Sequence, residues 1–328
     1  MLKNTLFFLF LFLFGFSFSQ QSIHGVITDR ETKEPMPYVS VSLSNSKRGT
    51  ISNAQGHFSF NLNQQDTSTY LLFTHIGYNI LKVKITRTNF PVVVTMEQKI
   101  NELSEVLIMP ENSLAKLLKS AYEKIDENYP VSKTRYLGFY RESSKGESKE
   151  YLSYGEAYIE AIRGSINLKN DKGQIKILKS RGGYLPGAET TIHFYGGAFL
   201  STQDFIQKRL NFIDPSHFNR YRYIIQKLDE YYKVSFSSKS EESGYSGYFI
   251  LDPQSLAYLE AKYKRFGSYD LELFYDKKES EFYDKFIGIE GKYYLKYRNF
   301  NGSGIDKIKR TKIYYFDEYL STEIYPNT

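Results

Sequence analysis

The sequence contains no cysteine and no tryptophan among its 328 residues. Without cysteine the chain can form no disulfide, no thiolate metal site and no cysteine nucleophile, so its stability must come from packing alone. The mature chain also lacks an apolar run of the ~20 residues that a membrane-spanning helix needs. The formal charge of +6 is mild and no long Lys/Arg cluster occurs. That balance disfavours nucleic acid as a partner and favours anionic surfaces such as lipid headgroups or acidic polysaccharide.

The N-terminus, residues 1–19, is predicted to be a signal peptide. Lys3 supplies a positive start, and Leu6–Phe14 is an unbroken run of Leu and Phe. Ser17 and Ser19 place small residues at the two positions that a signal peptidase reads, which predicts cleavage before Gln20. Because no cysteine is present for acylation at the cleavage point, we expect the mature chain to be exported without a lipid anchor at its start.

Aromatic residues make up 17% of the chain and include 30 tyrosines. Tyrosine-rich chains of high β propensity typically pack sheets, with the ring on a strand face and the hydroxyl reaching water. A binding surface lined by tyrosine is the functional alternative. From Ile23 to Met96, short segments alternate apolar and polar residues between turn signals, as at Phe58, Phe60 and Leu62. This spacing predicts a small antiparallel sandwich.

The order of residues in this region resembles the carboxypeptidase-regulatory-like domain, over about residues 21–108. The resemblance implies a transthyretin-like (prealbumin-like) sandwich of seven strands that acts as a spacer or interaction unit rather than a catalyst. Gly56 is expected to allow a tight hairpin and Gly77 a bend. The positions that carry the resemblance are Gly25, Val26, Asp29, Pro35, Val39, Val41, Gly49, Thr50, Gly56, Phe58, Gly77, Tyr78, Leu103, Glu105 and Val106.

Residues 111–129 are predicted to form a helix that ends before Pro130. Leu114, Leu118 and Ile125 belong to one apolar stripe at helical spacing. The opposite face is neutral to acidic, so we expect the stripe to pack in a core rather than on a membrane.

From Thr134 onward β patterning resumes, with one apolar and one charged face, as in an antiparallel sheet that is wet on one side. Gly244–Gly247 is interpreted as a hairpin turn, and Asn301–Gly304 as a turn between the last strands. Over about residues 112–320, the order of residues, above all in 134–162 and 231–265, resembles the region that follows this sandwich in uncharacterised exported Gram-negative proteins. These residues are also similar to the curved sheets of periplasmic lipoprotein carriers, in which a half-barrel wraps a helix.

No motif in the sequence indicates catalysis. The five histidines lack zinc-site spacing, and Gly-x-Ser-x-Gly is absent. Glu156 and Glu160 would lie ~13 Å apart on one strand, too far for a glycosidase pair, so each is expected to pair with a Lys or Arg across the sheet. We therefore expect no metal, no cofactor and no enzymatic activity. A buried cluster of His and carboxylates in one cleft would revive the enzyme hypothesis.

Two groups of residues are candidates for binding. The irregular segment 181–199 is framed by Gly-Gly pairs and offers a ligand site at Tyr184, His193, Phe194 and Tyr195; the alternative is a long connection whose aromatics enter the core. A basic cluster could contact an anionic surface through Lys307, Lys309, Arg310 and Lys312; the alternative is a charged strand that discourages edge-to-edge association.

The predicted fold is mostly β: a signal peptide (1–19), a seven-stranded prealbumin-like sandwich (20–108), then a helix and a curved, half-barrel-like antiparallel sheet (109–328). The predicted function is that of a non-catalytic binding or docking module of the cell envelope, located in the periplasm or at the outer membrane of a Gram-negative bacterium. Its partner would be an envelope protein, a lipid or a polysaccharide. The alternative is a periplasmic carrier of a lipid or lipoprotein acyl chain, which a dry cavity of a few hundred Å3 would favour and a filled core would not.

Overall fold

The computed structural model describes residues 21–44, 49–62, 70–75, 78–85, 91–98, 111–166, 173–184, 201–228, 230–272, 275–306 and 310–326. The predicted signal peptide lies outside these residues. The chain divides into two compact units, 1–99 and 100–328, which are taken in turn. No helix in the described ranges is long and apolar enough to cross a membrane.

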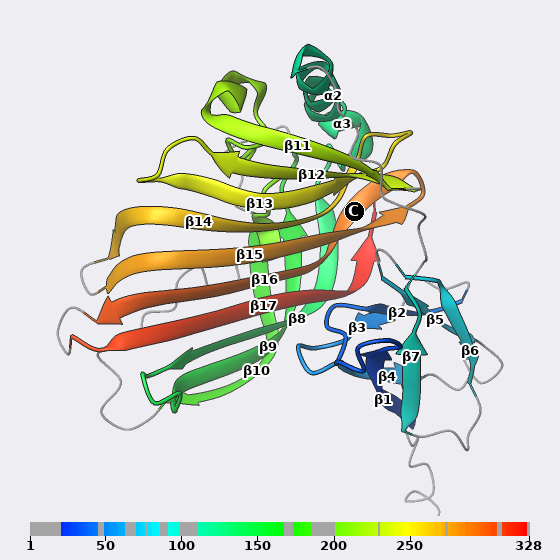
Figure 1. The fold of residues 1–328 in the computed structure, drawn as a ribbon. Coiled ribbons are helices and arrows are strands. Elements are labelled where there is room, and N and C mark those ends of the chain that lie inside the picture. Colours follow the sequence, from blue (N-terminus) through cyan, green and yellow to red (C-terminus); the bar gives the residue numbers. More distant parts are fainter. Residues whose placement is uncertain are drawn as a thin grey trace, which may run out of the picture. The chain divides into compact units, whose positions relative to one another are not determined.

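The described part of the first unit contains seven strands, the number that the family resemblance implied (Figure 1). A three-stranded sheet has the order β4-β1-β7, and a four-stranded sheet has the order β3-β2-β5-β6. The strands are β1 (Gln21–Asp29), β2 (Ser40–Leu43), β3 (Gly49–Ile51), β4 (His57–Leu62), β5 (Tyr70–Thr74), β6 (Leu81–Lys84) and β7 (Val92–Met96). One pairing departs from the expected antiparallel pattern, because β7 runs parallel to β1. The four-stranded sheet intervenes in sequence, so the chain returns to the first sheet by a crossover.

Alternation along the strands builds the core of this sandwich. On β4, Phe58, Phe60 and Leu62 are buried and the residues between them are exposed. Phe58 meets Phe73 of β5 edge to face, with ring centroids 5.5 Å apart. Because both sheets contribute to one apolar cluster, they pack face to face.

Two glycines in this unit occupy positions that reject a side chain. Gly56 has φ +73° and closes the turn after Asn53 by donating its N–H to the Asn53 carbonyl. It therefore acts in a tight turn as expected, whereas Gly77 lies outside the described residues. Gly25 sits in β1, where a Cβ would lie 2.0 Å from the Val92 carbonyl oxygen. The close approach of β1 to β7 thus requires glycine.

Asp29 has a structural role in this unit. Its carboxylate accepts N–H bonds from Glu31 and Thr32 and an O–H bond from Tyr78. The Tyr78 hydroxyl, followed by these backbone donors, holds the pKa of Asp29 well below its usual range. Asp29 therefore closes the turn after β1 and ties it to residue 78.

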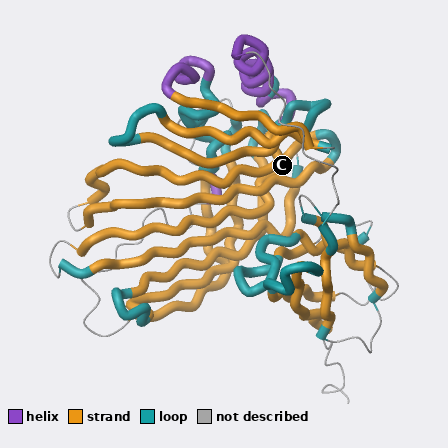
Figure 2. The backbone as a smooth tube through the Cα atoms, viewed as in Figure 1, coloured by secondary structure: helices purple, strands orange, loops and turns teal. Residues whose placement is uncertain are grey.

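The second unit is a ten-stranded, fully antiparallel sheet in the order β10-β9-β8-β17-β16-β15-β14-β13-β12-β11. Figures 1 and 2 show these strands side by side in one curved sheet. The strands are β8 (Thr134–Lys145), β9 (Tyr151–Arg163), β10 (Gln174–Tyr184), β11 (Tyr221–Leu228), β12 (Tyr231–Ser238), β13 (Gly244–Leu251), β14 (Tyr258–Glu272), β15 (Tyr275–Ile289), β16 (Lys292–Asp306) and β17 (Lys312–Tyr325). The expected mostly β fold, with a curved antiparallel sheet after a helix, is confirmed.

The predicted helix forms as two consecutive helices, α2 (Glu111–Glu123) and α3 (Ile125–Asn128). Their apolar stripe, including Leu118 and Ile125, is buried in the same cluster as the sheet, as the sequence predicted. Just after α3, the Tyr129 hydroxyl donates to the Tyr258 carbonyl at 2.7 Å. The helical segment is therefore anchored to the start of β14.

Both predicted glycine turns in this unit are wrong. Asn301–Gly304 lies inside β16, where Gly302 faces Tyr315 and Gly304 faces Ile313 across the pairing with β17. Gly244–Gly247 begins β13, and a Cβ on Gly247 would lie 2.1 Å from the Lys262 carbonyl oxygen. Gly247 accommodates the neighbouring strand β14, and Gly302 and Gly304 are paired within the sheet, so none of the three reverses the chain.

Candidate functional site

The inner face of the second sheet is covered by the chain itself. The segment 201–214, which precedes the 3-10 helix η3 (Pro215–Arg220), buries Phe205, Ile206, Phe212 and Ile213 almost completely. All four belong to the apolar cluster formed by the strands and the helices. We call residues 201–214 the plug segment.

Aromatic rings fix the plug segment against the strands. The ring of Phe212 stacks on Phe236 of β12 with centroids 4.3 Å apart, and it lies 5.1 Å from Tyr263 of β14. Phe205 contacts Tyr258 at 5.6 Å and Phe286 at 5.9 Å, both edge to face. Such geometries are favourable beyond the burial of apolar area. These side chains therefore fill the space between the plug segment and strands β12 and β14.

A buried ion pair fastens the plug segment to the edge region of the sheet. The guanidinium of Arg163, at the end of β9, pairs with Asp204, and both side chains are buried. Asp204 also accepts backbone N–H bonds from Ile206 and Gln207, each at 2.8 Å. Burial raises the pKa of Asp204, but Arg163 and the backbone N–H of Gln207 bring it below its ordinary value.

A second buried pair lies nearby on the strands. Arg298 of β16 and Asp284 of β15 approach to 3.4 Å, and Arg298 also donates to the Gln203 carbonyl at 2.6 Å. Asp284 accepts weakly from the Tyr263 hydroxyl at 3.3 Å. Burial raises the pKa of Asp284 to about 6, an effect that Arg298 opposes. Of the two carboxyls in these ion pairs, Asp284 is therefore the one whose ionised form is less favoured.

This raised pKa predicts a pH-dependent difference between the wild type and Asp284→Asn. From about pH 4 to 6 the folded protein keeps a proton on Asp284 that the unfolded chain has released. The stability that Asp284 contributes is therefore full at low pH and is lost as the pH rises through its folded pKa. The variant lacks this titration, so its free energy of unfolding relative to the wild type should rise between pH 4 and 7. Urea unfolding at several pH values measures it, and a constant difference would contradict the assignment.

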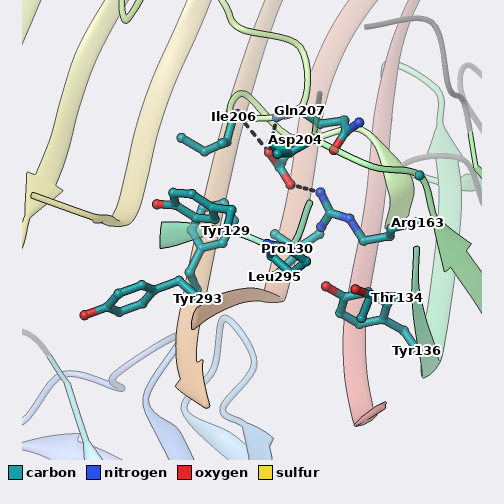
Figure 3. Close-up of a pocket in the computed structure, with 13 residues that line it drawn as sticks. Tyr129, Pro130, Thr134, Tyr136, Arg163, Asp204, Ile206, Gln207, Tyr293 and Leu295 are labelled. Carbon is teal, nitrogen blue, oxygen red and sulfur yellow. Dashed lines mark hydrogen bonds and ion pairs between the residues drawn. The ribbon is translucent and has the colours of Figure 1, made fainter. Parts of the chain in front are cut away.

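A small pocket opens beside the Arg163–Asp204 pair (Figure 3). Its walls include Tyr129, Tyr136 and Tyr293 together with Arg163 and Asp204. The cavity volume is about 20 Å3, which suits one water molecule. The Nη1 atom of Arg163 is buried and has no hydrogen-bond partner among the described residues, so it could donate to a water bound here. The pocket is far below the ~300–1,000 Å3 of a small-molecule site.

Three of the exposed large apolar side chains of the second unit lie on the edge strand β10, and another, Ile224, is 60% exposed on β11. Strand β10 has a neighbour on one side only among the described strands, and nearly all of its residues are exposed. Ile177 is 60% and Tyr184 64% exposed, and Leu178 is 44% exposed. At the opposite end of the sheet, η3 contacts both β11 and α2. An open edge with large apolar side chains is a template for pairing with another strand.

The predicted binding residues are only partly within the described structure. Tyr184 ends β10 and is exposed, whereas His193, Phe194 and Tyr195 lie outside the described residues. Lys307 and Lys309 also lie outside them. Arg310 and Lys312 are exposed, and the Lys312 N–H donates to Glu147 at 2.9 Å. The ligand-binding and anionic-surface roles remain predictions.

The carboxylates on β9 pair as the sequence indicated. Glu156 contacts Arg181 of β10 at 2.5 Å, and Glu160 contacts Arg135 of β8 at the same distance. Within the described ranges, no group of three His, Asp or Glu side chains is placed to hold a metal ion. The paired carboxylates on this strand therefore have a structural explanation.

The plug segment and its ion pairs escaped sequence reasoning. Phe205-Ile206 and Phe212-Ile213 are two apolar pairs seven residues apart in a stretch that is otherwise polar except for Leu210. That repetition was the available signal for burial. The pairing of Arg163 with Asp204 left no local signal, because the two residues are far apart in sequence.

Comparison with known proteins identifies part of the first unit. Residues 23–108 match the family model of the CarboxypepD_reg-like domain, so the expected domain is confirmed there. No curated protein matches the chain. Among solved structures, the chain is similar to a Bacteroides fragilis protein of unknown function that is provisionally described as membrane-associated. The two are 12% identical, the match covers 94% of this chain and 98% of that one, and the TM-score is 0.20.

Proposed function

We propose that this protein is a non-catalytic docking module of the Gram-negative cell envelope, exported by its N-terminal segment to the periplasm or the outer membrane. The carboxypeptidase-regulatory-like domain supplies one interaction unit, and the ten-stranded sheet supplies another. The partner is an envelope protein, and the protein has no cofactor and no catalytic site.

The main support for this proposal is that the plug segment fills the inner face of the sheet. A carrier needs a dry cavity large enough for an acyl chain, but the plug segment places Phe205 and Phe212 against the strands with both side chains fully buried. The cavity beside Arg163 holds about one water, at about 20 Å3. With its inner face packed, the sheet offers its edge for binding, and β10 exposes Ile177 and Tyr184 there. This favours docking over the carriage of a lipid.

Native mass spectrometry of the full chain, purified from its own envelope, tests the proposal. We expect a mass that corresponds to a complex with a second protein and no mass shift from a retained lipid. A co-purifying lipid in stoichiometric amount would contradict docking and support the carrier. A chain that carries neither a protein nor a lipid would count against both functions.

A further inference from the structure

The edge strand β10 contains a β-bulge, which places its cationic and its apolar side chains on opposite faces. In the pairing with β9, Ile177 lies opposite Ile159 and Lys179 lies opposite Tyr158, so Leu178 is an extra residue without a partner. An extra residue reverses the alternation of the side chains that follow it. The bulge therefore decides which residues after position 178 share a face with those before it.

The bulge gathers all three cations of β10 on one face. Lys176 lies opposite Glu160, Lys179 opposite Tyr158, and Arg181 opposite Glu156. Side chains opposite each other in an antiparallel pair share a face, and these β9 residues alternate with the core residues of the strand. With strict alternation, Lys176 would have faced the other side from Lys179 and Arg181. No Asp or Glu occurs in β10.

The other face of β10 has no charged side chain and carries Ile175, Ile177 and Tyr184. Ile175 and Ile177 lie opposite Ala161 and Ile159, which are buried in the core. Ile175 packs against that core, but Ile177 is 60% exposed because the sheet ends here. Tyr184 lies opposite the buried Ser153 on the same face and is also exposed. A strand added beside β10 would meet cations on one side and apolar side chains on the other.

We propose that β10 binds an extended segment of a partner protein in which acidic and apolar residues alternate, and that this segment adds to the sheet as an eleventh strand. Its backbone would pair with the outer backbone groups of β10, beside which no other described strand lies. Its acidic side chains would face Lys176 and Lys179, and its apolar side chains would cover Ile177 and Tyr184. This inference rests on the proposed docking function and names the chemistry of the partner.

The cations of β10 favour an acidic partner segment over the β10 strand of a second copy of the chain. Antiparallel pairing of two β10 strands would continue the cationic face across the junction and place like charges opposite each other, which is unfavourable. Arg181 already pairs with Glu156, but the structure records no ion pair for Lys176 or Lys179 within the described part of the chain. Lysines can also serve to prevent edge association, yet protection alone does not explain the exposed Ile177 and Tyr184.

The test uses the full chain and a synthetic peptide in which Glu and Val alternate. A peptide of the same composition, with its Glu and Val in separate blocks, is the control ligand. The double variant Lys176→Glu/Lys179→Glu reverses the cationic face. The matched control, Arg222→Glu/Lys227→Glu, reverses two exposed cations of the opposite edge strand, β11, which has no bulge and places them on opposite faces. Circular dichroism and the urea midpoint establish that both variants fold.

We expect the alternating peptide to bind and to slow hydrogen exchange at the amides of residues 174–184. Reversal of the β10 cations should weaken binding by about tenfold or more, since two attractions become repulsions. The β11 variant should bind as the wild type does. Equal binding of the block peptide, or binding without protection of β10, would overturn the proposal. So would binding of phosphatidylglycerol vesicles in place of the peptide.

Failure of this inference can be separated from failure of the docking function. If the wild type and Lys176→Glu/Lys179→Glu retain the same envelope partner in native mass spectrometry, β10 is not the binding edge and the docking function stands. If the wild type retains no partner, the docking function itself fails.

Discussion

Replacement of Asp204 by asparagine should lower the free energy of unfolding by about 3–5 kcal/mol, because it leaves the buried guanidinium of Arg163 without its counter-ion. Both side chains are buried, at 8% and 0% exposure. Asparagine keeps the size of the side chain and an oxygen that can accept the N–H groups of Ile206 and Gln207. The loss therefore reports the charge pair rather than the turn. Urea unfolding at neutral pH measures it.

The same substitution at Asp126 is the matched control. Asp126 forms an ion pair with Arg209 at 2.7 Å, but its side chain is 52% exposed. Solvent screens this pair, so Asp126→Asn should cost no more than about 1 kcal/mol. Losses of equal size at the two positions would show that Arg163 does not depend on Asp204 for compensation.

Replacement of Phe212 by alanine should cost about 3–5 kcal/mol, because it removes a fully buried ring and leaves a cavity. The ring stacks on Phe236 at 4.3 Å and lies 5.8 Å from Phe205, so neighbours surround it on more than one side. A cavity lined by aromatic and aliphatic groups stays dry and accepts small apolar molecules. The Phe212→Ala variant should therefore gain stability from added benzene, whereas the wild type should not.

Phe218 offers a comparison within the adjoining helix η3. It is half-buried and contacts Tyr223 with centroids 5.6 Å apart. Phe218→Ala should cost about 1 kcal/mol, in proportion to the smaller apolar area it covers, and should create no benzene site. A loss at Phe212 no larger than the loss at Phe218 would mean that the plug segment does not fill the sheet.

Local patterns in the sequence were sufficient wherever an element has one buried face. The alternation around Phe58 and Phe60 predicted β4, and the stripe that contains Leu118 and Ile125 predicted the helix. In both cases the period of the apolar residues equals the period of the structure. The family resemblance added the number of strands in the first unit, which periodicity alone did not determine.

The same reasoning failed where glycine lies inside a strand. Gly302 and Gly247 suggested turns because glycine is common there, but each lies within a paired strand. The bulge at Leu178 was equally hidden, since it depends on the register with β9. The buried ion pairs were not predicted for a related reason. Asp204 contacts Arg163 and Arg298 contacts Asp284 across distant segments, and a single sequence does not indicate such pairings.

The position of β17 in the sheet has a consequence for folding. This strand is the last in chain order among those described, yet it lies between β16 and β8, near the middle of the sheet. Until it arrives, β8–β10 and β11–β16 are two separate arrays that both expose an unpaired edge. Pairings of such long sequence separation form slowly and leave exposed strands open to aggregation. The sheet of the second unit should therefore be completed only after β17 has been made, and a holding chaperone would act on the two arrays before β17 inserts.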